Sequence, residues 1–339
     1  MWLNVVWFIL FVFIIAGYLI MDGFDLGVGI LHPFVAKNDE ERRVSLNSIG
    51  PVWDGNEVWL VLGGGALFAA FPIVYAALFS GLYLAMMLVL LVLILRTVAI
   101  EFRSKRSSPR WRTFWDWVFF GSSLGIALLL GVAFGNILEG LPIDADGFVH
   151  ARLNDLLTPY ALLVGVTTVF MLATHGAIYL SMKASGELLA RVKRWVLRLM
   201  LIFFVLNTLV VGMTAYLREA VSTRYWSHPW LAILPATALL AATLAWVMVR
   251  REHDFIAFLL SSIMIVSLLA SAAVGLYPNL LISSLDPRYN LTIFNAASQP
   301  NTLTVMLVMA FIGMPFVLLY TIGVYYVFRG RVKLEPGGY

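Results

Sequence analysis

The chain has 339 residues, of which 61% are hydrophobic and 12% charged, with a net charge of +4 and no cysteine. Such a chain has too little polar surface for a water-soluble globule of this length, so we expect an integral membrane protein. The lack of cysteine excludes disulfides, thiolate-bound iron–sulfur clusters and a cysteine-bridged copper centre within the chain.

Nine stretches are long and apolar enough to span a membrane, since a span needs about 20 such residues. They lie at roughly 2–25, 56–76, 79–100, 116–138, 159–182, 196–217, 230–249, 255–277 and 303–328. The first lacks a basic n-region and a small-residue cleavage site, so we expect it to be retained as a helix. The short link between the second and third predicts an antiparallel hairpin that turns near Ala77 to Ser80.

The spans predict an all-α polytopic membrane protein of about nine transmembrane helices. Mostly short loops favour two four-helix bundles plus one peripheral helix. We expect a single domain over residues 1–339, with approximate halves at 1–138 and 159–328, the second including the peripheral helix.

Basic residues are distributed unevenly between the loops on the two sides of these spans. Eighteen of the 23 Lys and Arg residues follow the first, third, fifth, seventh and ninth spans, while four lie in the other loops and Arg96 lies inside the third span. Because basic residues accumulate in cytoplasmic loops, we predict that the N-terminus is outside and the C-terminus cytoplasmic. The positive net charge therefore reflects topology and needs no nucleic-acid partner.

Four carboxylates are expected near the cytoplasmic boundary. Asp22 and Asp25 lie in "MDGFDLGVGI", and Asp54 and Glu57 lie in "PVWDGNEVWL". Each pair is three residues apart and shares a helix face if the helix continues through it. Arg96 is the cation at matching depth, which suggests a carboxylate–arginine network. The acids are either helix ends that are solvated or paired with Arg96, or a proton entry path of coupled buried carboxylates.

Two further features point to packing rather than to ligand binding. The glycines of "LGGGALFAA", Gly63 to Gly65, suit close helix packing, and no strand precedes them as a phosphate-binding loop would require. His175 is the one histidine inside a span, and we expect a lone histidine in "ATHGAIY" to be a hydrogen-bonded packing residue. No metal site is predicted.

The segment "DGFDLGVGILHPFVAKNDEERRVSLNSIGPVWDGNEVWLVLGGGALFAAFPIVYA", together with "EFRSK", resembles subunit II of the cytochrome bd-type quinol oxidases. The resemblance is densest over the first 105 residues or so. It implies nine spans in two bundles, with haems b and d and the quinol-oxidising loop in the homologous subunit I. It also implies that Asp25 and Asp54 feed protons from the cytoplasm towards those haems, with Glu57 and Arg96 supporting them.

The resemblance further implies a non-haem accessory subunit of an enzyme that oxidises quinol and reduces O2 to water in the bacterial cytoplasmic membrane. Its partners would be subunit I, small single-helix subunits, lipid and quinone. Trp7, Phe8 and Phe13 could line a groove for the tail of a structural quinone, although lipid-facing positions explain them equally well. The alternative from the residues alone is a secondary transporter, or a proton-conducting membrane subunit unrelated to oxidases. The acids of a transporter would lie near the midplane in paired repeats.

Overall fold

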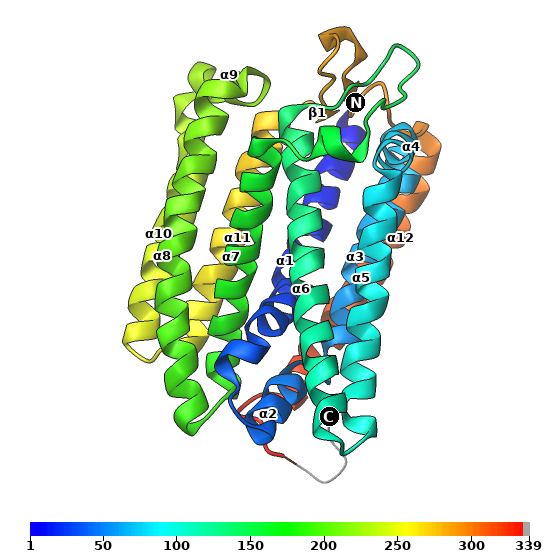
Figure 1. Ribbon diagram of the computed structural model, residues 1–339. Helices are drawn as coiled ribbons and strands as arrows, with labels where there is room; N and C mark the ends of the chain where they lie inside the picture. The colour runs from blue at the N-terminus through cyan, green and yellow to red at the C-terminus, as the bar shows by residue number, and fades with distance from the viewer. Residues whose placement is uncertain (335–339) are drawn as a thin grey trace.

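The structure, a computed structural model, describes residues 1–334 and consists of long helices that run between two ends of the molecule (Figure 1). Eight helices in this part of the chain are long and apolar enough to cross a membrane. They are α1 (Trp2–Val35), α5 (Tyr83–Phe102), α6 (Pro109–Glu139), α7 (Pro159–Lys183), α8 (Gly186–Leu217), α10 (Ile233–Arg250), α11 (Asp254–Leu276) and α12 (Pro300–Val327).

The second predicted span corresponds to α3 (Trp53–Ala70), which packs along α1. Its first turns carry the polar residues Asp54, Asn56 and Glu57, and α3 is not among the eight apolar helices named above. With α3 included, the nine predicted spans all correspond to helices.

Two details of the prediction are wrong. α1 does not end at residue 25 but continues to Val35, because residues 26–32 are buried inside the protein rather than exposed at a membrane surface. The second and third spans do not form a hairpin at Ala77 to Ser80: Pro72 disfavours a helical conformation at Phe71, so α3 stops and a separate helix, α4 (Pro72–Gly81), lies between α3 and α5. α3 packs mainly on α1, whereas α5 packs on α6.

Shorter elements cap the two ends of the helices. At the end with α2 (Asp39–Ile49), the Asn38 side chain accepts a hydrogen bond from the Glu41 amide and so starts that helix. The opposite end carries α9 (Glu219–Ser227) and the two-stranded sheet of β1 (Asn279–Leu281) and β2 (Leu291–Thr292). Four single 3₁₀ turns complete the described chain, at Arg103–Lys105, Leu153–Leu156, Pro229–Ala232 and Pro287–Tyr289.

The long helices form two groups that pack against each other. α1, α3, α5 and α6 make up one group, and α7, α8, α10 and α11 the other, joined where α7 packs on α1 and α6. A methyl group at Gly27 would lie 2.0 Å from the carbonyl oxygen of Leu172, so glycine is what allows α1 and α7 to approach so closely. α12 contacts α1 and α3, and almost all of its side chains remain at least partly exposed, so it is the peripheral helix.

Candidate functional site

A buried ion pair lies between α1 and α5. Nη1 and Nη2 of Arg96 donate to the two carboxylate oxygens of Asp22 at 2.9 and 2.5 Å, and both side chains have no exposed surface. The expected contact between Arg96 and the acids therefore exists, and Asp22 makes it. Because both oxygens of Asp22 are held by a permanently charged guanidinium, Asp22 is a fixed counterion.

Asp25, one turn further along α1, has a different environment. Its Oδ2 accepts a hydrogen bond from Nδ2 of Asn56 at 2.7 Å and lies 4.0 Å from Nη2 of Arg96. Its Oδ1 is buried and has no hydrogen-bond partner within residues 1–334. The hydroxyl of Tyr325 on α12 donates to Oδ1 of Asn56 at 2.9 Å. Asp25 therefore combines one oxygen held in place by Asn56 with one buried oxygen that accepts no hydrogen bond within the described chain.

Asp54 and Glu57 lie on α3 at increasing depth. Asp54, in the first turn of α3, is exposed and forms no hydrogen bond or ion pair with any residue of the described chain. Glu57, one turn later, is partly buried and close enough to interact electrostatically with Arg96. The structure thus brings Asp22, Asp25, Glu57 and Arg96 together and leaves Asp54 at the surface of the subunit.

A second buried ionic cluster was not anticipated from the sequence. Asp116 of α6 accepts hydrogen bonds from Nε2 of His32 at 2.8 Å, from Nη1 of Arg42 at 2.7 Å and from Nε of Arg103. His32 and Arg103 lie seven residues beyond Asp25 and Arg96 respectively, which places this cluster two helical turns, about 10 Å, nearer the α2 end. The sequence signal for this cluster was the equal spacing of seven residues from Asp25 to His32 and from Arg96 to Arg103.

The two buried histidines have both ring nitrogens engaged. His175 bonds Ser261 Oγ at 2.8 Å and the Ile20 carbonyl oxygen at 3.1 Å, and its ring stacks on Phe258. His32 bonds Ser45 Oγ at 3.2 Å besides Asp116. An axial haem ligand needs a free imidazole nitrogen, so neither ring is arranged for iron. Nor do residues 1–334 contain a group of three or more potential metal ligands.

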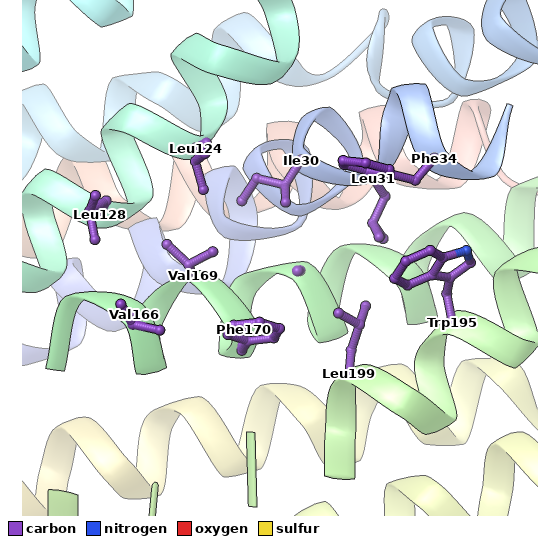
Figure 2. Close-up of a pocket in the computed structure, with 11 residues that line it drawn as sticks. Ile30, Leu31, Phe34, Leu124, Leu128, Val166, Val169, Phe170, Trp195 and Leu199 are labelled. Atoms are coloured by element: carbon purple, nitrogen blue, oxygen red, sulfur yellow. The ribbon is translucent and has the colours of Figure 1, made fainter. Parts of the chain in front are cut away.

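An apolar pocket of about 360 Å³ lies between α1, α6, α7 and α8 (Figure 2). Ile30 and Phe34 of α1, Val169 and Phe170 of α7 and Trp195 of α8 are among the residues that line it. The aromatic residues expected to form a groove lie elsewhere: Trp7 is buried and donates to the Leu303 carbonyl oxygen, Phe8 packs against Tyr277, and Phe13 is exposed.

Comparison with known proteins gives one consistent result. The family model for cytochrome bd terminal oxidase subunit II matches residues 3–328. The chain belongs to this family. It is 37% identical to cytochrome bd-I ubiquinol oxidase subunit 2 of Escherichia coli (strain K12), over 98% of this chain and 96% of that protein. It is 38% identical to cytochrome bd ubiquinol oxidase subunit 2 of Bacillus subtilis (strain 168), over 99% of each.

A solved structure of a bd oxidase shares the fold of this cytochrome bd subunit II. The chain from Geobacillus thermodenitrificans superposes with a TM-score of 0.80 over 97% of this chain and 99% of that one, at 18% sequence identity. This subunit II is thus an integral membrane component of an oxidoreductase complex, and the resemblance noted in its first hundred residues extends over nearly the whole chain.

Proposed function

We propose that this chain is the accessory subunit of a quinol oxidase that assembles with a haem-bearing subunit I and takes up protons from the cytoplasm. Its relatives are named as ubiquinol oxidase subunits. The engaged nitrogens of His32 and His175 agree with haems b and d being held by subunit I. The observation that carries the proton role is the fully buried Asp25, which has one free oxygen beside a fixed ion pair.

The subunit is oriented with its N-terminus outside and its C-terminus in the cytoplasm of a bacterial cell. The two ends of the described chain lie at opposite ends of the helices, and the basic connections next to α2 and between α5 and α6 share the end of the C-terminus (Figure 1). Because cytoplasmic loops are the basic ones, this end faces the cytoplasm. Asp54, Glu57 and Asp25 are then reached from the cytoplasmic side.

One face of α3 contacts subunit I in this proposal. Asp54, Val58, Val61, Gly65 and Phe68 follow one another at helical spacing, and all five are exposed. Exposing a carboxylate to lipid costs free energy, so this face of α3 is more stable when a protein partner covers it. A methyl group at Gly65 would meet no atom within 4 Å, so this glycine leaves space for a neighbouring helix outside the subunit.

The acids of α3 and α1 then form a route for protons. Asp54 takes a proton from the cytoplasmic edge of the interface, Glu57 continues one turn deeper, and Asp25 is the innermost acid with a free oxygen. The Asp22–Arg96 pair supplies a fixed charge balance beside this route and does not itself carry protons. General acid–base transfer of this kind needs carboxyl groups placed in sequence along the route, and Asp54, Glu57 and Asp25 supply them.

The apolar pocket is our candidate position for the tail of a structural quinone. Its lining side chains offer no hydroxyl, amide or charged group to bind a quinone head group, so it suits an isoprenoid chain alone.

The substitution Asp54→Asn tests the proton role. It preserves shape and removes the titrating proton, so we expect turnover of the purified oxidase to fall at least about tenfold while the haem content stays complete, since a barrier increase of about 1.4 kcal/mol suffices. Haem content and quinol oxidation are measured on the same sample.

The matched control is Asp146→Asn, an exposed acid in the loop between α6 and α7 at the other end of the molecule. Its turnover should equal that of the unchanged complex. Full haem content with unchanged turnover in Asp54→Asn would refute the relay role of Asp54.

A further inference from the structure

Tyr325 connects the peripheral helix to the buried acid of α1. α12 lies on the outside of the helical groups, yet the Tyr325 hydroxyl reaches Oδ1 of Asn56 at 2.9 Å. The Tyr325 ring also lies edge-on to Phe24, the neighbour of Asp25 in the chain, with 6.3 Å between ring centroids. Tyr325 thus contacts the surroundings of Asp25 from a helix that otherwise buries little.

The hydrogen bond from Tyr325 supports the orientation of the Asn56 amide in which Nδ2 faces Asp25. Nδ2 of Asn56 donates to Oδ2 of Asp25 at 2.7 Å and to the Met21 carbonyl oxygen at 3.3 Å. A turned amide would instead direct its oxygen towards a carboxylate and a carbonyl, two groups that only accept hydrogen bonds while Asp25 is ionised. A phenol donating to Oδ1 of Asn56 opposes that turn, because Oδ1 must then face α12.

The orientation of the amide in turn sets the orientation of the carboxyl group. With Oδ2 held by Asn56, the remaining oxygen of Asp25 is the buried Oδ1, which has no partner among residues 1–334. A carboxyl group held by one oxygen presents the other in a defined direction, and a defined geometry is what proton transfer over hydrogen-bond distances needs.

We infer that Tyr325 is a positioning residue for Asp25, acting through the Asn56 amide to keep Oδ1 of the carboxyl group available for proton transfer. This inference rests on the proposed role of Asp25 in proton uptake. It makes α12 a functional part of the acid site and not only a peripheral span.

The test compares Tyr325→Phe with Tyr326→Phe in the assembled oxidase. Both variants lose one phenol hydroxyl and keep the ring, and Tyr326 is 65% exposed with Arg329 over its ring. For Tyr325→Phe we expect complete haem content, an unchanged KM for quinol, and a turnover number lowered about threefold to tenfold, the effect of one hydrogen bond on a rate. The ratio of turnover in H2O to that in D2O should rise, because proton delivery becomes rate-limiting. Tyr326→Phe should change none of these.

A double-mutant cycle shows whether the effect passes through Asn56. Asn56→Ala should slow turnover at least as much as Tyr325→Phe, and the double variant should be no slower than Asn56→Ala alone. Independent, multiplying effects would overturn the inference, as would failure of Tyr325→Phe to assemble, because the hydroxyl would then be structural.

Asp25→Asn separates this inference from the proposed function. If Asp25→Asn retains full turnover and the normal isotope ratio, the proton role of Asp25 is refuted and the inference falls with it. If Asp25→Asn is slow but Tyr325→Phe behaves like Tyr326→Phe, only the positioning role is overturned.

Discussion

At the scale of single residues, the energetics of the acid site depend on the Arg96–Asp22 pair. Taking both charges out of water is costly, and their attraction together with two hydrogen bonds offsets that cost only while both partners are present. Asp25, whose Oδ2 lies 4.0 Å from the same guanidinium, makes no hydrogen bond to it and so compensates its charge less well than Asp22 does. The two acids of "MDGFD" therefore have different tasks, although they lie one turn apart on the same helix.

Asp22→Asn should prevent stable assembly of the oxidase. It leaves the buried Arg96 without the one carboxylate that is hydrogen-bonded to it, a loss of up to about 3–5 kcal/mol. Haem content and yield of the purified complex measure the effect. Asp54→Asn, in an exposed position, serves as the matched variant and should assemble normally.

Replacing both partners refines this prediction. Asp22→Asn combined with Arg96→Met also removes the buried positive charge that has lost its hydrogen-bonded counterion, and should recover part of the yield. Normal yield from Asp22→Asn alone would show that the pair is not needed for stability.

At the scale of the helices, the approach of α1 to α7 joins the two groups of the fold. Gly27 and Gly176 face each other there, and a methyl group on either would lie under 3 Å from backbone atoms of the other helix. Of the three glycines expected to serve packing, Gly63 does so against Ile15, while Gly64 and Gly65 meet nothing inside the subunit. The close backbone contact between α1 and α7 thus occurs at Gly27 and Gly176, which do not lie in a run of glycines such as Gly63 to Gly65.

Gly27→Ala should destabilise the subunit by about 1–3 kcal/mol or more, because the added methyl group overlaps the Leu172 carbonyl oxygen and backbone cannot move aside as a side chain can. The thermal unfolding midpoint of the purified complex measures this. Gly212→Ala, on α8 with open space at the new methyl group, should leave the midpoint unchanged or raise it, since alanine favours a helix over glycine. Equal midpoints for the two variants would contradict the packing argument.

At the scale of the whole molecule, the orientation determines from which side protons reach the acids. The chain contains no cysteine, so a single introduced cysteine reports its own side of the membrane. Ser107 lies in the exposed connection between α5 and α6, and Ser284 is exposed near the sheet at the opposite end.

A cysteine at Ser107 should react with a membrane-impermeant thiol reagent only from the cytoplasmic side, and a cysteine at Ser284 only from outside. Labelling of intact cells and of inverted vesicles distinguishes the two. The reverse pattern would invert the topology and place the acid site on the outer side.

The sequence by itself determined the class of the fold and its spans, because hydropathy and helix length are properties of local stretches of chain. The run of three glycines also predicted Gly63 as a packing residue, and Gly63 does pack against Ile15. Boundaries that depend on neighbours were missed: burial of residues 26–32 prolongs α1, and the effect of Pro72 on Phe71 divides the second span.

Only the tertiary structure decided which residues meet. Sequence spacing placed Asp22 and Asp25 on one helix face. The rotation of α5 relative to α1 brings Arg96 into hydrogen-bond contact with Asp22, whereas Asp25 accepts a hydrogen bond from Asn56, which in turn accepts one from Tyr325. The cluster of His32, Asp116 and Arg103 has the same origin: the equal spacing of His32 and Arg103 hints at a common depth, but nothing local places Asp116 of α6 between them. These contacts between helices join residues up to 269 positions apart in the chain, and the packing of the helices in three dimensions decides which of them meet.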